Sequence, residues 1–406
     1  MKEYGKGNED VCGMKSQMSF FNRKSRLERR SYEKKLFLLL LSASITMAGL
    51  TGCGNKTDDN IIKIGFAGPL TGDCSQDGIA CKEAAQLAVQ EINDAGGING
   101  KQVELVVYDD KSDPKEAAIV ANKLAEDASI LGVVGHYNSS CILSGAPIYN
   151  KAGVVEVAYG SSAPAVTDAG DYTFRVLNSD DMQGALVADW AVNELGYKNC
   201  AIVYENSDYG LGNAESFKKA AQGYGAAIVS EDSYITGQTK DFTSILTNIK
   251  NSDAEMIFVG GLYNECAMML KQAKTVGLDI QMMSTDGVFS PSLIELSGEA
   301  GEGFLLIGTF HLENPAEICQ KFISEYETMY DGKEPGTYAA MSYDATRVLL
   351  EALKNGCTDR EAVREFLTTM EDFPGAAGDI TFDENGDVLK APLKLVIRNG
   401  EYALYE

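Results

Sequence analysis

Short apolar runs alternate with longer segments of helical periodicity along most of the chain. The run 61–66 is rich in isoleucine, a glycine-rich turn follows it, and residues 78–93 place apolar side chains near one face of a helix. Residues 130–135 form a continuous apolar run, which is typical of a strand buried on both faces of a parallel sheet. This alternation predicts strand–helix units joined by right-handed crossovers.

The alternation forms two series, and each series has about the length of one α/β lobe. Strands are expected at 61–66, 103–109, 130–135, 154–158, 199–204, 227–230 and 256–260. Helices are expected at 78–93, 113–127, 144–152, 182–195, 212–224 and 242–251 and across 316–369, with a terminal hairpin at 393–404. Because 406 residues exceed one ordinary core, we predict an α/β fold with two Rossmann-like doubly wound lobes. No long linker separates the two series, so several short hinge strands are expected to join the lobes.

The first 52 residues have the features of an export signal. A basic stretch at 23–35 runs into an apolar segment of about 15 residues, which is shorter than the roughly 20 that a membrane span needs. The segment ends at Leu50-Thr51-Gly52-Cys53, which resembles the lipobox of bacterial lipoproteins and implies lipidation of Cys53. We therefore expect a lipoprotein signal peptide at 1–52, a polar tether at 53–60, and an anchor on the outer face of the bacterial cytoplasmic membrane.

Charge and cysteine content narrow the possible partners. The formal net charge of −24 argues against nucleic acid and anionic lipid surfaces as partners. The seven cysteines after Cys53 show no CxxC spacing, so no zinc site is expected. Cys74 and Cys81 are the best candidates for a disulfide in an exported protein, although the pairing stays open.

The sequence contains no recognisable catalytic motif. His136 and His311 are the two histidines, and neither lies near a serine nucleophile motif; there is no GxSxG, HExxH or P-loop. Gly210-Leu211-Gly212 lacks the third glycine of a dinucleotide fingerprint. We therefore expect no enzyme activity, no cofactor and no metal.

Small and hydroxyl residues follow two of the predicted strands. Residues 135–140 come after one strand and open a helix, and residues 159–164 come after the next strand. Ligands of open α/β sheets bind at the carboxyl ends of the strands, facing the N-termini of helices. Helix-start amides and serine hydroxyls suit a carboxylate, but the same residues are also common as caps and turns.

Ordered segments of this kind run through nearly the whole chain after Ile61. They include Gly68-Pro69-Leu70-Thr71-Gly72, Gly96-Gly97-Ile98-Asn99-Gly100-Lys101, Tyr108-Asp109-Asp110, Gly135-His136 with Ser139-Ser140, and Asp286-Gly287-Val288. In their order and spacing they resemble the periplasmic leucine/isoleucine/valine-binding protein family. The resemblance implies two lobes that close on an amino acid, the first from 61–177 and 310–388 and the second from 178–309 and 389–406.

The resemblance also implies which side chains hold the ligand. Its carboxylate would be held by Ser139 with Gly160 and Ser162, its ammonium by Asp286, and the opposite lobe would contribute Tyr209 and Tyr263. An ammonium sealed from water needs a carboxylate partner, because an unpaired buried charge is very costly. Asp286 is one methylene shorter than the usual glutamate, so the ammonium must lie closer or a water must bridge.

One departure from the family concerns Asp77, which stands where an aromatic ring usually lies against the substrate side chain. If Asp77 points into the pocket, a polar or cationic side chain would match it, and specificity would be shifted away from aliphatic ligands. The alternative is that Asp77 turns to solvent or caps the helix that begins near Gly78. Tyr137 could then supply the missing apolar wall.

The resemblance implies the binding component of an ATP-driven importer. It would be a monomer that captures a free amino acid, branched-chain or related, and delivers it to ABC permease subunits. Two alternatives stay open. One is a ligand-sensing lipoprotein that hands its signal to a separate kinase, and the other is an amide- or urea-type binder of the same fold.

Overall fold

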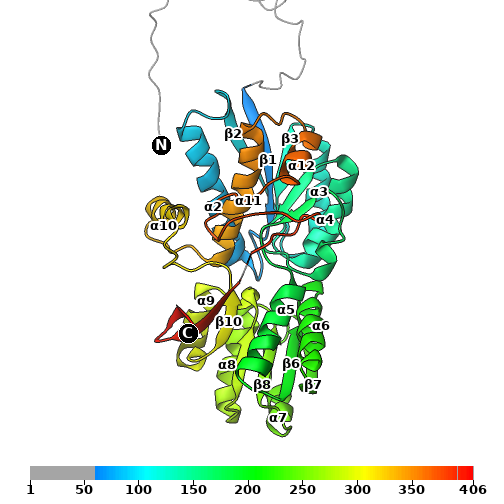
Figure 1. Cartoon of the computed structure of the whole chain (residues 1–406), viewed down its shortest axis with the longest axis vertical. Helices are drawn as coiled ribbons and strands as arrows, with labels where there is room; N and C mark the ends of the chain where they lie inside the picture. The colour runs from blue at the N-terminus through cyan, green and yellow to red at the C-terminus, as the bar shows by residue number, and fades with distance from the viewer. Residues whose placement is uncertain (1–59, 391, 406) are drawn as a thin grey trace, which may run out of the picture. The chain divides into compact units, whose positions relative to one another are not determined.

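Two β-sheets organise the part of the chain that this computed structural model describes, residues 60–390 and 392–405 (Figure 1). The first sheet has five parallel strands, and the second has seven strands, one of which runs antiparallel to its neighbours. The predicted α/β class with two doubly wound lobes is confirmed. The predicted leader and the lipidation at Cys53 lie outside the described residues.

The first sheet carries the first series of predicted strands. Its order is β2-β1-β3-β4-β5, with β1 at Ile61–Gly68, β2 at Gln102–Asp109, β3 at Ile130–Val134, β4 at Val155–Ala158 and β5 at Thr173–Arg175. Its helices are α2 (Ser75–Asp94), α3 (Pro114–Glu126), α4 (Ser139–Ala152), α10 (Glu317–Met329), α11 (Thr337–Lys354) and α12 (Arg360–Leu367), with a 3₁₀ turn at Pro164–Val166. We call this sheet with its helices lobe 1.

The second sheet has the order β12-β11-β10-β9-β8-β6-β7. Its strands are β6 (Asn199–Glu205), β7 (Ala227–Tyr234), β8 (Met256–Gly260), β9 (Gln281–Ser284), β10 (Leu305–Gly308), β11 (Leu393–Arg398) and β12 (Glu401–Leu404). Its helices are α5 (Asp180–Asp189) with a π-helical turn at Trp190–Glu194, α6 (Asp208–Gly223), α7 (Thr243–Lys250), α8 (Tyr263–Val276) and α9 (Pro291–Ser297), with 3₁₀ turns at Asp286–Val288 and Gly298–Gly301. The antiparallel strand is β11, and this sheet with its helices is lobe 2.

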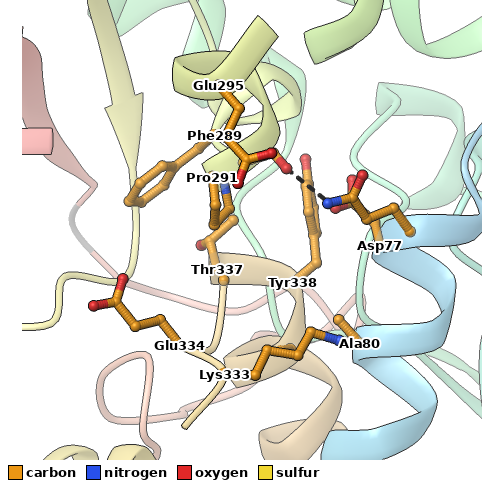
Figure 2. A pocket seen from close by; sticks show the side chains of 13 residues that line it. Asp77, Ala80, Phe289, Pro291, Glu295, Lys333, Glu334, Thr337 and Tyr338 are labelled. Carbon is orange, nitrogen blue, oxygen red and sulfur yellow. Dashed lines mark hydrogen bonds between the residues drawn. The ribbon is translucent and has the colours of Figure 1, made fainter. Parts of the chain in front are cut away.

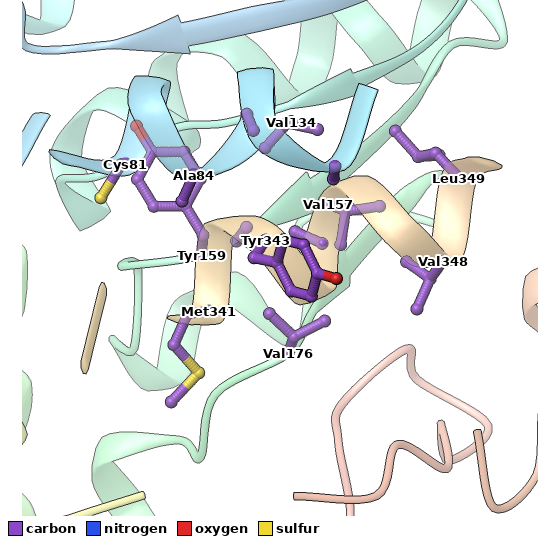
Figure 3. Close-up of a cluster of buried hydrophobic side chains, with 14 of the residues drawn as sticks. Cys81, Ala84, Val134, Val157, Tyr159, Val176, Met341, Tyr343, Val348 and Leu349 are labelled. Carbon is purple, nitrogen blue, oxygen red and sulfur yellow. The ribbon is translucent and has the colours of Figure 1, made fainter. Parts of the chain in front are cut away.

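The core of lobe 1 joins segments that are far apart in the sequence. Val134 and Val157 of the sheet lie in one buried cluster with Val348 and Leu349 of α11 (Figure 3). A Cβ at Gly132 would lie only 2.8 Å from a methyl carbon of Leu349, so the glycine lets α11 approach β3 closely. Packing of this helix therefore fixes the strand ends from which the loops of the site emerge.

Local sequence explains where several helices begin. Asp113 caps α3 with its side chain, which accepts hydrogen bonds from the amides of Lys115 and Glu116, and Pro114 occupies the first turn as predicted. Helix α6 begins at Asp208, four residues earlier than expected, because the Ser207 hydroxyl accepts from the Gly210 amide and caps it. The first turn contains glycines, which have low helix propensity, and for this reason the sequence pattern did not predict it.

Helix α4 also begins earlier than the sequence indicated. It starts at Ser139, directly after the turn that follows β3, whereas the periodicity favoured Ser144. The polar residues of its first turn and Pro147 inside the helix interrupt the apolar pattern. The earlier start matters for function because it places Ser139 itself at the helix N-terminus.

Cys74 and Cys81, the candidate pair whose connection the sequence left open, form no disulfide. All seven cysteines within the described residues are free. Six of them, including Cys74 and Cys81, are buried, and Cys357 is half-buried. Cys74 is the N-cap of α2, and Cys81 lies seven residues along the same helix. A helix rises about 1.5 Å per residue, so their Cα atoms are too far apart for the roughly 7 Å limit of a disulfide.

The chain passes between the lobes at three places. It leaves lobe 1 after Arg175, returns after Gly308, and leaves again after Val388. The lobes also touch through hydrogen bonds. Ser140 Oγ donates to Asp208 Oδ2 (2.6 Å), and Asn264 Nδ2 donates to the Asp73 carbonyl (3.3 Å).

Candidate functional site

A cavity of about 620 Å³ is lined by loops and helix starts from both lobes. Lobe 1 contributes Tyr137, Ser139 and Gly160, and lobe 2 contributes Glu205 and Tyr209, among other residues. The lobe 1 residues follow β3 and β4, and those of lobe 2 follow or end β6. The cavity therefore lies at the carboxyl ends of parallel strands, where open α/β sheets bind ligands.

The two lobe 1 loops of the cavity are held against each other. The Ser161 hydroxyl donates to the carbonyl oxygens of His136 (2.9 Å) and Tyr137 (3.2 Å), and the Ala163 amide donates to Ser139 Oγ (3.2 Å). A Cβ at Gly160 would lie 2.7 Å from the Tyr137 carbonyl oxygen, so this close approach requires glycine. Ser139 at the start of α4 is thus fixed beside amides that have no partner within the helix.

The loop 135–140 is also held in place by buried contacts of His136. His136 is fully buried, and its Nδ1 lies 2.7 Å from Oδ2 of the equally buried Asp110, while its Nε2 lies 3.5 Å from the Tyr149 hydroxyl. These contacts orient the loop from the side away from the cavity. His136 therefore acts as a structural residue here, in keeping with the expectation that it has no catalytic partner.

Two of the expected residues carry buried polar atoms without a partner. Both carboxylate oxygens of Asp286 and the hydroxyl of Ser162 are buried and make no hydrogen bond to any described residue. Burial raises the pKa of Asp286 to about 7, although Gln183 and nearby backbone amides lower it somewhat. Buried polar groups are normally satisfied, so unpartnered groups of this kind indicate a missing ligand.

The two tyrosines of lobe 2 are almost completely buried. The Tyr209 hydroxyl lies 3.0 Å from Thr285 Oγ1, and Tyr209 packs into the core cluster of lobe 1. Gly287 makes room for it, since a Cβ there would lie 2.0 Å from the Tyr209 hydroxyl. Tyr263 is the first residue of α8 and packs in the core of lobe 2.

Asp77 faces the interior between the lobes. Its side chain is 8% exposed, and it accepts hydrogen bonds from the Tyr137 hydroxyl (2.9 Å) and, across to lobe 2, from Ser290 Oγ (3.3 Å). It therefore neither turns to solvent nor caps α2, whose N-cap is Cys74. Burial raises the pKa of Asp77 to about 6, and the hydroxyl donors and the charge of Lys333 oppose this rise.

A second cavity of about 280 Å³ lies on the other side of Tyr338. Asp77 and Ala80 of α2 line it opposite Phe289 and Pro291, and Tyr338 lies between them (Figure 2). Tyr338 also lines the larger cavity, where its ring makes an edge contact with Tyr137 at 5.0 Å between centroids. Tyr338 is thus a shared wall of the two cavities.

The structure brings together part of the expected set in each cavity. Ser139, Gly160, Tyr137 and Tyr209 line the larger cavity, and Asp77 lines the smaller one. Ser162, Tyr263 and Asp286 are buried and line neither cavity. Tyr209 and Tyr338 line the larger cavity together, and the Tyr209 hydroxyl contacts Thr285, the residue before Asp286, so these residues surround one centre. Burial, and then the charges of Asp286 and Tyr209, raise the pKa of Tyr338.

Sequence reasoning missed three residues of this centre. Tyr338 opens α11, Asp180 is the first residue of α5, and Gln183 accepts a hydrogen bond from the Asp286 amide (3.2 Å). For Asp180 and Gln183, the sequence offers one indication, which is an acidic helix start shortly after the strand that ends at Arg175. Nothing local distinguishes Tyr338 from an ordinary core tyrosine.

The described residues offer neither a metal site nor a membrane span. Within residues 60–390 and 392–405, no group of three or more His, Cys, Asp or Glu is placed to hold a metal ion. Across the same residues, every helix is too short or too polar to cross a bilayer.

Taken together, the fold and the site define a two-lobed solute-binding protein, with a cavity at the N-terminus of α4 and unpartnered acidic oxygens of Asp286 buried outside the lining of that cavity. A family model described as periplasmic binding protein matches residues 61–396. The chain belongs to this family, which confirms the resemblance. Its members bind solutes for transporters and are not enzymes, so the expectation of no enzyme activity is confirmed as well.

Individual relatives are similar over most of their length. The chain is 31% identical to the Leu/Ile/Val-binding protein homolog 1 of Brucella melitensis, over 86% of this chain and 92% of the relative. It is also 31% identical to the leucine-, isoleucine-, valine-, threonine-, and alanine-binding protein of Pseudomonas aeruginosa, over 90% and 94% of the two chains. The crystal structure of the leucine binding protein LivK from Thermotoga maritima has a TM-score of 0.80 at 31% identity and covers 85% and 98%. The LivJ structure from Streptococcus pneumoniae in complex with isoleucine has a TM-score of 0.79 at 31% identity and covers 84% and 97%.

Proposed function

We propose that this protein is an extracytoplasmic lipoprotein that captures a free amino acid, branched-chain or related, between its lobes and delivers it to an ABC importer. The relatives above are named for binding leucine, isoleucine and valine. The predicted signal at 1–52 and an acylated Cys53 would hold the protein, as a monomer, on the outer face of the cytoplasmic membrane beside its permease.

The acidic pole is the observation that carries this proposal. Asp286 and Ser162 present buried oxygens that have no partner among the described residues; Ser162 follows β4 of lobe 1 and Asp286 follows β9 of lobe 2. A buried carboxylate without a partner is costly to keep, and a ligand ammonium is the complementary group. The arrangement suits a small ligand that brings its own positive charge.

The second pole would hold the carboxylate of the same ligand. Ser139 opens α4, where backbone amides and the positive end of the helix dipole favour an anion. Tyr137, Tyr209 and Tyr338 would surround the remainder of the ligand. A zwitterion with one ammonium and one carboxylate on the same carbon matches both poles.

The side-chain end of the ligand would approach the Asp77–Tyr137 pair. Asp77 is buried there and already accepts two hydrogen bonds. An aliphatic side chain gains nothing from this carboxylate, whereas a side chain that ends in a donor can add a third bond to it. We therefore expect the specificity to be shifted towards polar or cationic amino acids, and tighter binding of leucine than of serine, glutamine or arginine would contradict this expectation.

A thermal-shift screen tests the proposal. The purified protein is heated with each of the twenty amino acids, with simple amides and with urea. A ligand at 100 times its dissociation constant adds about 2.7 kcal/mol of stability and raises Tm by a few degrees. A shift with amides or urea alone would identify an amide-type binder, and no shift with any amino acid would refute the proposed cargo.

Blocked ligands then test the two poles separately. The N-acetyl form of an amino acid that shifts Tm should lose its effect because it lacks the ammonium, and the methyl ester should lose it because it lacks the carboxylate. The neutral variant Ser139→Ala should weaken the free amino acid more than it weakens the ester. Equal binding of the blocked and free forms would place the ligand elsewhere.

A further inference from the structure

Asp180 is a second buried carboxylate that finds no partner within the described part of the chain. It is the first residue of α5, its side chain is fully buried, and neither of its oxygens accepts a hydrogen bond there. Its backbone amide donates to the Ser162 carbonyl (2.8 Å), so Asp180 lies directly beside the loop 159–164 of lobe 1, which we call the ligand loop. It is not one of the residues that the family resemblance assigned.

Contacts from several elements place Asp180 at the acidic pole. Gln183, three residues later and on the same face of α5, accepts from the Asp286 amide. A Cβ at Gly212 of α6 would lie 3.1 Å from Asp180 Oδ2 and 2.7 Å from Pro164 Cδ, so α6, α5 and the lobe 1 loop converge there. The pKa of Asp180 is raised well above its ordinary range by burial and by the charge of Asp286, while the side chains of Ser162 and Asn213 and the charge of Arg175 oppose this rise.

The nearby cation cannot neutralise Asp180 by contact. A guanidinium has five N–H donors, and the five hydrogen bonds of Arg175 go to the carbonyls of Ser162 and Ala163, to Thr167, and twice to Asp387. Arg175 thus holds the ligand loop, and no donor remains for Asp180. The carboxylates of Asp180 and Asp286 and the hydroxyl of Ser162 therefore all lack a hydrogen-bond partner among the described residues.

We infer that Asp180 and Asp286 together hold one primary ammonium of the ligand, with Ser162 Oγ accepting its third N–H. This inference rests on the proposed function and deepens it, because it restricts the ligand to primary amines. A primary ammonium has three N–H donors and can bond Asp180, Asp286 and Ser162 Oγ at once. An N-methylated amine has only two N–H donors, and its methyl group would face one of these three acceptors. An unpaired carboxylate would then stay buried, which is strongly unfavourable.

Titration calorimetry on the full chain tests this inference with L-leucine, L-threonine and L-alanine, each beside its N-methyl form. Asp180→Asn should weaken the free amino acid by roughly 30-fold or more, since it removes one partner of a buried charge pair. Asp181→Asn is the matched control, because Asp181 lies in the same helical turn, bonds Ser216 and is exposed, so it should change affinity by less than about threefold.

Thermal unfolding without ligand separates ligand binding from a structural role. If Asp180 serves the ligand, Asp180→Asn leaves Tm unchanged or raises it, because a carboxyl group that is buried without a partner in the unliganded protein is replaced by a neutral amide. If Asp180 merely stabilises the start of α5, the variant lowers Tm, and that result overturns the inference.

The remaining outcomes are equally decisive. Unchanged affinity in Asp180→Asn, or equal binding of N-methyl and free amino acids by the wild type, overturns the two-carboxylate site while the proposed function stands. Failure of the wild type to bind any of the three amino acids, together with a negative thermal panel, overturns the proposed function and this inference with it.

Discussion

Lowering the pH from 8 to 5 should weaken ligand binding by about 100-fold through the protonation of Asp286. Burial raises the pKa of this carboxyl to about 7 in the unliganded protein. The groups around it are Asp180 and Gln183 of α5, Tyr209 of α6 and Tyr338 of α11, and none of them is a cation. Arg175 lies near Asp180, but all five of its N–H donors bond other groups, so a ligand ammonium would be the cation that contacts the Asp286 carboxylate.

The sign and size of the effect follow from this linkage. Because the ammonium binds the carboxylate, affinity is complete above about pH 7 and falls as the pH drops below that value. At pH 5, two units below, about 1% of Asp286 is ionised, which corresponds to a loss of about 2.7 kcal/mol. In the same range the protein should release close to one proton for each ligand bound.

Calorimetry measures both quantities with the amino acid that gives the largest thermal shift. Titrations at pH 5, 6, 7 and 8, in two buffers of different ionisation enthalpy, give the affinity and the number of protons released. Asp286→Asn should bind weakly and without this pH dependence. Asp344→Asn is the control, because burial also raises the pKa of Asp344, but the amides of Ala376 and Ala377 satisfy its carboxylate and it lines neither cavity, so the pH dependence of binding should persist in this variant. An affinity that stays constant or rises between pH 8 and pH 5 in the wild type would refute the reasoning.

Three further results are expected. The unliganded protein should melt at a lower temperature at pH 8 than at pH 5, because the folded-state pKa of Asp286, near 7, exceeds the unfolded value and stability is lost as the pH rises between them. In differential scanning calorimetry, Asp286→Asn should show a smaller fall in Tm between pH 5 and pH 8 than the wild type, with the remainder due to Asp77 and Glu205, and an equal fall would contradict this. Gly160→Ala should reduce amino-acid affinity at least tenfold while the far-ultraviolet circular dichroism stays native, since its Cβ would displace the Tyr137 backbone; normal affinity would contradict the loop geometry. Tyr137→Phe should cost about 1–3 kcal/mol in denaturant unfolding, because it removes one of the two donors to buried Asp77; a loss below 0.5 kcal/mol, within the range of an ordinary surface substitution, would show that the bond is dispensable.

Local pattern was sufficient for most of the fold. The strands β1 to β4 and β6 to β8, the helix that begins near Asp113 and the terminal hairpin were predicted from periodicity and turn residues, which act over a few neighbouring positions. The strands β5, β9 and β10 and the helices α8 and α9 were not predicted. Helix starts at Ser139 and Asp208 were placed several residues too late, because polar or glycine residues in a first turn lack the apolar signal. The family resemblance added the candidate residues, and the structure puts Ser139 and Gly160 on one cavity and leaves Asp286 buried without a partner.

The tertiary structure alone decided which buried polar groups are satisfied. Asp77 receives its donors from positions 60 and 213 residues away, so the sequence left both of its orientations open. Asp180 looks like an ordinary acidic helix start in the sequence, and it becomes a candidate ligand group only because α5, α6 and the Ser162 loop enclose it while Arg175 is fully engaged elsewhere. Periodicity reports which side chains are buried, but the cost of a buried charge depends on the partners that distant elements bring to it, and those partners exist only in the folded chain.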